Sequence, residues 1–152
     1  MSTLKSYDTI SGKEGTAFIK IDGKNKEIFR AKSIEANVEI KKGSVKCIGR
    51  RMEGSKPTGM KGSGKMTLYY GFPLFAEVIR QYKDEGKALY FDLLLTNDDP
   101  ASAAGKQTVL LKDCSVDGML LSKLDGDSDD PLEDDMSFTF EDYEFLSMFK
   151  EI

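Results

Sequence analysis

The chain has 152 residues, a net charge of −4 at pH 7 and a pI near 5.0, a length that suffices for one domain with a sizeable core. This net negative charge argues against nucleic-acid binding as the main role, because neutralising phosphates requires a basic surface. Only a local basic segment of the chain could supply such a surface. No run approaches the ~20 apolar residues of a membrane span, and the polar N-terminus lacks the apolar region of a secretory signal. We therefore expect cytoplasmic synthesis without Sec-type export.

The N-terminal third is predicted to start as an irregular arm and to continue as strands. Residues 1–15 are polar and are expected to form that arm. Apolar residues alternate with other residues over 17–21, which predicts a strand, and residues 22–25 combine Asp, Gly and Asn in the manner of a tight turn. The clearest period of two covers residues 34–40, which predicts a strand with one buried and one solvent-exposed face.

Residues 41–65 form a basic, glycine-rich segment in which one acid, Glu53, stands against eight basic residues. The many glycines and Pro57 disfavour a compact core here. We interpret the segment as a long hairpin arm whose tip, residues 52–64, is mobile until a partner docks on it. A strand is expected to resume at residues 66–70. The basic residues are Lys41, Lys42, Lys46, Arg50, Arg51, Lys56, Lys61 and Lys65.

One helix is predicted after this segment. Pro73 suits its first turn, Gly86 suits its C-terminal end, and apolar residues recur between them at helical spacing. Residues 88–96 are apolar on nearly both faces, so we expect a central strand there. Residues 107–124 are predicted to form a strand pair or one bent strand, with Gly118 as the bulge or turn.

An acidic loop is predicted at residues 125–135, where seven carboxylates and no basic residue occur. Residues 136–140 then alternate as a strand, and the phase of the alternation shifts near Asp142. Many strands and one helix, without a βαβ rhythm, indicate a mainly β, antiparallel β-sandwich or barrel with one packed helix and a long hairpin arm. We expect residues 1–152 to form a single domain.

Catalytic motifs are weak in this chain. The chain contains no His, so neither a zinc site of the Cys/His type nor the usual His general base can form. Residues 59–65 match the first seven positions of a phosphate-binding loop, but Met66 replaces the required Ser or Thr, and a strand-like run follows where a helix is needed. We therefore predict no enzyme activity and no cofactor.

A metal site and a disulfide are also disfavoured. Residues 125–130 resemble the start of a calcium-binding loop, but Asp130 occupies the position that requires glycine and Met136 the position that requires glutamate. Loose Ca²⁺ or Mg²⁺ binding remains an alternative to a solvated acidic loop. Cys47 and Cys114 are far apart in the sequence and are expected to be free thiols.

Several segments together resemble one family. GRRMEGSKPTGMKGSGKMTLYY (49–70), the run from FDLLLTNDDP to LSKLD (91–125) and FTFEDYE (138–144), with the leader SGKEGTAFIKIDGK (11–24), are similar to the core tail tube protein of contractile phage tails. The likeness is strongest to PBSX-like prophage and R-type bacteriocin tubes. It covers essentially the whole chain in order, although no single motif is diagnostic.

This resemblance implies a structural self-assembly protein without catalysis. Members of the family form hexameric rings that stack into a hollow tube inside a sheath, and a long hairpin arm reaches a neighbouring subunit or ring. The implied partners are other copies of the chain, the sheath protein, baseplate or initiator proteins and a tail terminator, with DNA only as cargo in the lumen. The implied location is the virion tail or a phage-tail-like particle.

The residues suggest how copies could meet. Residues 41–65 carry a net charge of +7 and residues 125–135 a net charge of −7, so we hypothesise that the two regions pair between subunits or rings. Solvated or lumen-facing acids, and a nucleic-acid-binding module that uses the basic arm, are the alternatives. The predicted interface residues are the eight basic residues of the segment together with Asp125, Asp127, Asp129 and Asp130.

Overall fold

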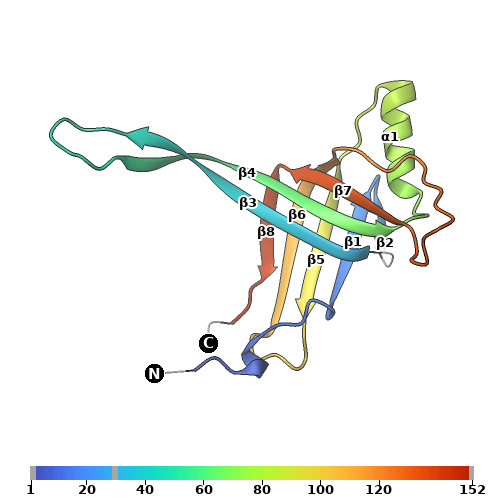
Figure 1. Ribbon diagram of the computed structural model, residues 1–152, viewed down its shortest axis with the longest axis horizontal. Helices are drawn as coiled ribbons and strands as arrows, with labels where there is room; N and C mark the ends of the chain where they lie inside the picture. The colour runs from blue at the N-terminus through green and yellow to red at the C-terminus, as the bar shows by residue number, and fades with distance from the viewer. Residues whose placement is uncertain (1–2, 29–30, 151–152) are drawn as a thin grey trace.

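Two packed β-layers form the body of the molecule, and a long hairpin projects from one of them (Figure 1). The computed structural model describes residues 3–28 and 31–150. The elements in chain order are the 3-10 turn η1 (Ser6–Asp8), β1 (Gly15–Ile21), β2 (Lys24–Glu27), β3 (Ala31–Val45), β4 (Gly54–Tyr69), α1 (Leu74–Glu85), β5 (Phe91–Asp98), β6 (Lys106–Val116), β7 (Glu133–Phe140) and β8 (Asp142–Ser147).

The β5 layer has the strand order β2-β1-β5-β6-β8, and the arm layer has the order β7-β4-β3. All pairings between these strands are antiparallel. Strand β6 belongs to both layers, because its first part pairs with β5 and β8 while Ser115 and Val116 pair with β7. The predicted fold class, an antiparallel β-sandwich with one packed helix and a hairpin arm, is confirmed.

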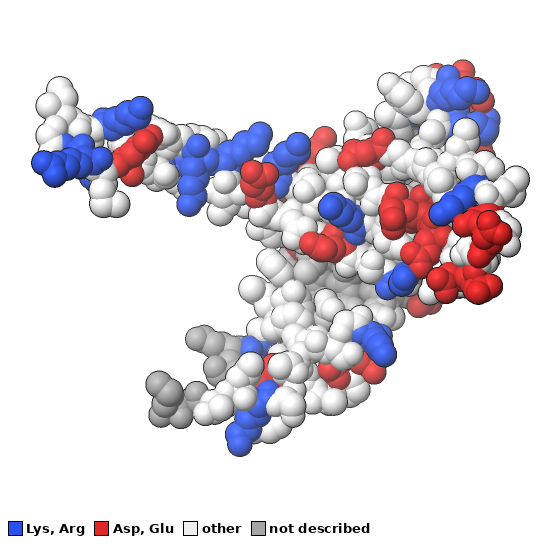
Figure 2. Space-filling model, viewed as in Figure 1, with Lys and Arg blue, Asp and Glu red and all other residues white. Residues whose placement is uncertain are grey.

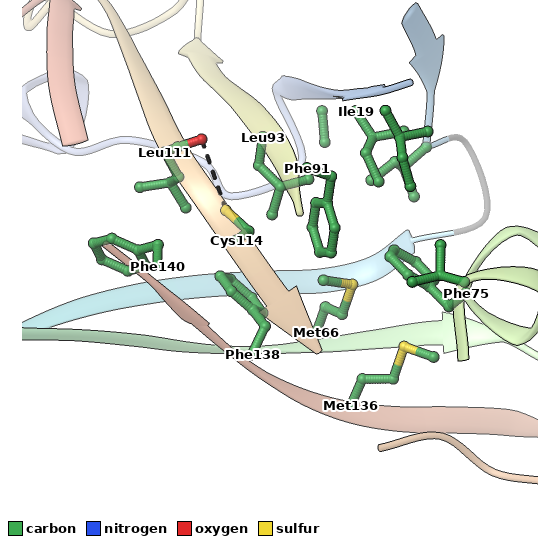
Figure 3. Packing of buried hydrophobic residues seen from close by; sticks show 14 of the residues in the cluster. Ile19, Met66, Phe75, Phe91, Leu93, Leu111, Cys114, Met136, Phe138 and Phe140 are labelled. Carbon is green, nitrogen blue, oxygen red and sulfur yellow. Dashed lines mark hydrogen bonds between the residues drawn. The ribbon is translucent and has the colours of Figure 1, made fainter. Parts of the chain in front are cut away.

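The hydrophobic core lies between the two layers (Figure 3). Alternate residues of the strands point into it, so that Ile19, Leu93 and Leu111 from the β5 layer face Met66 and Phe138 from the arm layer. The helix closes one end of the core, because Phe75 is fully buried and its ring lies 5.5 Å from the ring of Phe91.

The local signals for the helix and for the first turn are confirmed. Helix α1 follows Pro73 and ends before Gly86, which adopts a left-handed conformation with a φ of 67°. At the predicted turn, Asp22 and Gly23 have φ angles of 52° and 78°, which suits a two-residue hairpin turn. The chain pairs again at once as β2, a short strand that the sequence pattern did not predict.

The N-terminal arm predicted at residues 1–15 is attached to the body from Tyr7 onward, since the N–H of Ala103 donates to the carbonyl of Tyr7 at 2.7 Å, and residues 1–2 lie outside the described residues. The backbone N–H of Ser11 donates to Asp99 Oδ2 at 2.9 Å, and the N–H of Asp98 donates to the carbonyl of Glu14 at 3.0 Å. Gly15 then opens β1. Strand β5 begins at Phe91, three residues later than the start of the predicted run at 88–96.

The prediction for residues 107–124 is wrong in its second half. Strand β6 bends at Asp113, which has a φ of 53° beside a register shift, and it ends at Val116. Residues 117–132 are irregular, and the N–H of Leu120 donates to the buried carboxylate of Asp134 at 3.1 Å instead of to a neighbouring strand. The bend therefore belongs at Asp113, where β6 passes from one layer to the other, and not at Gly118.

The acidic loop and the last strands need a smaller adjustment. Strand β7 begins at Glu133, so the last three residues of the predicted loop 125–135 belong to a strand. The phase shift predicted near Asp142 occurs at Glu141, where the chain leaves β7 in the arm layer and enters β8 in the β5 layer. A change of layer reverses which side chains face the core, which explains the shift in the pattern.

Candidate self-assembly surfaces

The hairpin of β3 and β4 is an arm because it is longer than the sheet that supports it. The two strands pair from Ala31 opposite Leu68 out to Val45 opposite Gly54. Strand β7 pairs with β4 only between Gly62 and Tyr69, so residues 39–61, here called the free arm, pair only with each other. Figure 1 shows the free arm extending well beyond the body.

The predicted tip of the arm, residues 52–64, is misplaced. Residues 54–64 belong to strand β4, and the loop that joins the two strands covers residues 46–53. Pro57 is accommodated next to a register shift, where Thr58 is the extra residue and its hydroxyl donates to the carbonyl of Lys41 at 3.2 Å. Gly62 and Gly64 lie under aromatic rings of β7, so these glycines mark packing and not a flexible tip.

The basic residues of the segment point to solvent. All eight are exposed, and seven of them lie on the free arm, with Lys65 at its base. Among the residues that the structure describes, no salt bridge involves any of these cations. Lys61 and Lys65 have Glu39 and Glu35 opposite them in the hairpin, whereas the cations farther out have no acid in the facing position, so the outer part of the arm presents a cluster of like charges. Figure 2 shows these basic side chains along the arm.

The predicted acidic residues lie at the other end of the molecule (Figure 2). Asp125, Asp127, Asp129 and Asp130 are exposed in the loop between β6 and β7. This loop contacts the chain just beyond the C-terminal end of β4, where the N–H of Tyr70 donates to the carbonyl of Leu132 at 2.9 Å. Strand β4 has 16 residues, so the arm loop and the acidic loop are about 50 Å apart at ~3.3 Å per residue. The structure does not bring the two regions together within one chain.

The free arm also has an exposed apolar face that the sequence pattern did not reveal. The face of β3 that was predicted to be buried is covered only at its base, where Ile34 is half-buried and packs on the core. Farther out, Val38 at the base of the free arm is 39% exposed, and Ile40 and Met60 on the free arm are 52% and 59% exposed. Ile40 and Met60 are opposite each other in the hairpin, beyond the edge of the β5 layer that covers the same face near the body. The predicted alternation of residues 34–40 is therefore correct, but the β5 layer does not extend far enough to cover the apolar side chains at the outer end of this strand.

This apolar face continues into a groove where the two layers diverge. The groove has a volume of about 410 Å³. Its walls come from both layers and include Ala36, Val38, Val109, Phe140, Tyr143 and Phe145. Contiguous exposed apolar surface of this kind marks contact sites for proteins.

The weaker motifs of the sequence lie on ordinary structural elements. Residues 59–65 are extended within β4, with β3 as their partner, so their N–H groups do not form the cradle of a phosphate-binding loop. In the acidic loop, the N–H of Asp127 donates to Asp125 Oδ1 at 3.1 Å. Within residues 3–28 and 31–150, no group of three or more acidic or Cys side chains is arranged to hold a metal ion. Cys47 and Cys114 are free thiols.

Comparison with known proteins decides the family. The family model described as phage tail tube protein matches residues 2–147. The chain belongs to the phage tail tube protein family. It is 41% identical over 141 residues to the PBSX phage-like element protein XkdM of Bacillus subtilis (strain 168), a match that covers 93% of this chain and 92% of XkdM. It is 40% identical over 147 residues to the uncharacterised protein YqbM of the same organism, covering 97% of each.

Solved structures share the tail tube fold with this chain. A chain of the anti-feeding prophage baseplate has a TM-score of 0.67 at 14% identity, covering 96% of this chain and 97% of its own length. A chain of an extracellular contractile injection system sheath–tube complex has a TM-score of 0.64 at 8% identity, covering 96% and 93%. The tail tube of SPP1 has a TM-score of 0.63 at 13% identity, covering 90% and 78%.

The role of this tail tube protein is therefore structural, as a building block of a tube. Of the helices in the described part of the chain, none has the length and apolar character that a membrane crossing requires. Its notable surfaces are the basic free arm, the apolar face of that arm and the acidic loop at the opposite end. Sequence reasoning found the two charged surfaces but could not see that Val38, Ile40 and Met60 are uncovered, because alternation does not report what lies above a strand.

Proposed function

We propose that this chain forms hexameric rings that stack into the hollow inner tube of a contractile tail or phage-tail-like particle. The observation that supports this proposal is the polarity of the subunit, with a basic arm at one end and an acidic loop at the other. Two different, complementary surfaces at opposite ends make a head-to-tail contact, which repeats along an axis until it forms a filament. The 6-fold symmetrised baseplate among the similar structures supports the ring size.

In this arrangement the free arm of one subunit reaches a subunit of the next ring. Its cations would meet Asp125, Asp127, Asp129 and Asp130 there, and its apolar face would be covered by the same neighbour. The whole chain acts as one domain, with residues 41–65 and the acidic loop as its contact segments. Each ion pair is worth only ~0.2–1 kcal/mol at an exposed site, so the apolar face supplies a needed part of the contact energy.

The proposed partners follow from the similar assemblies. Those structures include a sheath–tube complex, a baseplate and a tube-terminating cap, so we expect this chain to contact a sheath protein, a baseplate initiator and a terminator. DNA is proposed as cargo that passes through the lumen. The chain is proposed to have no catalytic activity, in keeping with its membership of a family of structural tube proteins.

Negative-stain electron microscopy of the purified chain at high concentration, beside light scattering, tests this function. We expect rings with six-fold symmetry or hollow tubes, with a baseplate initiator added if assembly does not start unaided. A chain that stays monomeric in the presence of the initiator would contradict the proposal. A salt-titrated DNA-binding measurement on that monomer would then decide whether the basic arm binds nucleic acid instead.

A further inference from the structure

The arm loop presents an apolar side chain at its tip. The N–H of Arg50 donates to the carbonyl of Cys47 at 3.3 Å, and Gly49 between them has a φ of 82°. These residues form a β-turn with glycine at its third position, which places Ile48 at the corner of the turn. The side chain of Ile48 is fully exposed. The turn therefore holds an apolar side chain in a fixed position at the end of a basic loop, which suits insertion into a partner.

An apolar pocket lies at the opposite end of the molecule, where the end of β4, the start of α1 and the irregular chain after β6 meet (Figure 1). Its volume is about 220 Å³. A cavity of about 150 Å³ is enough to hold a benzene molecule, so this pocket can take an isoleucine side chain. The hydroxyl of Tyr70 donates to the carbonyl of Leu121 at 3.5 Å and joins two of its walls. The walls include Leu68, Tyr70, Phe72, Pro73, Met119 and Leu121.

The pocket also contains a buried carboxylate. Asp134 lies on its wall and is 9% exposed. The N–H of Leu120 donates to Asp134 Oδ1 at 3.1 Å, but within residues 3–28 and 31–150 no salt bridge involves this carboxylate. Burying a carboxylate costs free energy unless a cation pairs with it. An arginine from a partner would suit this position, because its N–H groups can bind both oxygens of a carboxylate.

The arm loop has the groups that complement this pocket. Arg50 and Arg51 follow the turn directly, so the loop offers a guanidinium two or three residues from Ile48. The acidic loop lies beside the pocket, because Tyr70 on the pocket wall also donates its N–H to the carbonyl of Leu132. Carboxylates at this place attract a basic partner from a distance. The arm of the same chain cannot fill the pocket, since the two are about 50 Å apart along β4.

We propose that the arm loop of one subunit docks in this pocket of a second copy of the chain. The side chain of Ile48 enters the apolar part, and the guanidinium of Arg50 or Arg51 pairs with Asp134. This inference rests on the proposed function, since it names the place at which the arm meets the next subunit. The acidic loop draws the arm in, and the pocket holds it in one register. Ion pairs of exposed aspartates are weak, so the pocket supplies the specificity of the contact.

Disulfide trapping in assembled tubes tests the docking site. Leu121→Cys places a thiol at the rim of the pocket, on a side chain that is 81% exposed, and the native Cys47 lies next to Ile48 in the turn. A disulfide requires the two Cα atoms to come within about 7 Å of each other. Because the two positions are far apart in one chain, an oxidant can join them only between chains. Each chain can then be linked to two others.

We expect mild oxidation with copper phenanthroline to convert Leu121→Cys tubes into covalent multimers longer than dimers on a non-reducing gel. Leu124→Cys is the matched control, because Leu124 is 95% exposed in the same loop and does not line the pocket. It should cross-link several-fold more slowly, and adding Cys47→Ser to Leu121→Cys should remove the multimers. Absence of multimers in Leu121→Cys tubes, or equal rates at positions 121 and 124, would overturn the proposal.

Substitutions in the two partners separate docking from chance proximity. Ile48→Ser should slow the cross-linking of Leu121→Cys about tenfold, because burial of an isoleucine contributes a factor of this order. Asp134→Asn keeps a hydrogen-bond acceptor but removes the charge, and it should also slow the reaction. Combining Asp134→Asn with Arg50→Gln and Arg51→Gln should add no further loss, because the groups are partners. Additive losses would show that the arginines bind elsewhere.

Failure of the proposed function gives a different result from failure of this inference. If the wild type forms no tubes even with the initiator, both proposals fall. If tubes form and Asp127→Cys in the acidic loop gives multimers while Leu121→Cys does not, the tube stands and only the docking site is wrong. Tyr70→Cys, on the facing wall of the pocket, replaces Leu121→Cys if that variant does not assemble.

Discussion

Gly64 of β4 lies directly under the aromatic ring of Phe138 of β7, its partner in the sheet. A Cβ at position 64 would collide with this ring and would also stand 2.5 Å from the carbonyl oxygen of Glu35 on the other side. The same relation recurs one row farther out, between Gly62 and Phe140. Because Gly62 and Gly64 have no side chains, the rings of Phe140 and Phe138 can pack directly on the backbone of β4 where the arm leaves the body.

Gly64→Ala should destabilise the folded subunit, because the added methyl group collides with a fully buried ring and with backbone. Overpacking of this kind costs about 1–3 kcal/mol. Urea denaturation of the unassembled subunit, followed by circular dichroism, measures the change. Gly59→Ala is the matched control in the same strand, because nothing lies within 4 Å of its added Cβ. Equal stability of the two variants would contradict this account of the glycines.

Ile40→Thr should weaken assembly without destabilising the subunit. Ile40 is 52% exposed, so we expect the free energy of unfolding to change by less than about 0.5 kcal/mol. If a neighbour covers Ile40, each contact should lose about 1 kcal/mol and weaken roughly fivefold. The concentration at which light scattering first rises reports this loss. The adjacent Glu39→Gln, on the opposite face of β3, should assemble like the wild type, and unchanged assembly of Ile40→Thr would show that the apolar face is not a contact.

Asp127→Asn, Asp129→Asn and Asp130→Asn, combined in one chain, should slow and reduce tube assembly. The cause is the loss of attraction to the basic arm of a neighbour, and the effect should be largest at low salt because salt screens exposed charges. Light scattering over a range of salt concentrations measures it. A control with the same change in charge, Glu14→Gln, Glu27→Gln and Glu85→Gln, should assemble nearly normally. A triple Asn variant that assembles like the wild type at low salt would refute the pairing.

The two cysteines should differ in reactivity and in their effect on stability at high pH. Burial raises the pKa of the Cys114 thiol from 9.0 to about 12, and this thiol donates to the carbonyl of Leu111 at 3.7 Å, whereas Cys47 is exposed. At pH 8, a thiol reagent should modify Cys47 alone in the folded subunit and both residues after unfolding.

The raised pKa of Cys114 should make the folded subunit less stable as the pH rises above 9.0. The folded state keeps the Cys114 proton above pH 9.0, where the unfolded state releases it, so stability is complete below pH 9.0 and falls as the pH rises towards about 12. Urea denaturation at pH 8 and pH 10 should therefore show a smaller loss in Cys114→Ala than in the wild type. Parallel losses in the two proteins would exclude Cys114 as a source of the pH dependence.

Local sequence was sufficient for the elements whose signals act over a few residues. Pro73 and Gly86 bracket the helix because each satisfies a backbone requirement of a helix end. The alternation at residues 17–21 and 136–140 predicted strands because one side of each strand meets a core. The opposite charges of the arm and the acidic loop were also visible, since they are matters of composition.

Other features depend on contacts between distant residues. The bend of β6 at Asp113 arises because one strand pairs with two layers, which no local pattern records. The glycines at positions 62 and 64 suggested a flexible tip, although their role is to admit rings from β7, about 75 residues later in the chain. The separation of the arm from the acidic loop follows from the length and pairing of β4.

The sequence by itself thus determined the mainly β class, the helix, the existence of a hairpin arm and the resemblance to tail tube proteins, because periodicity and composition carry that information locally. Only the tertiary structure decided that the side chains of Val38, Ile40 and Met60 are exposed to solvent. It also decided that the basic arm and the acidic loop lie at opposite ends of the subunit. The physical reason is that a strand alternates in the same way whether or not a second layer covers it. Where the β5 layer ends, the apolar face of the arm continues, and another subunit must supply its cover.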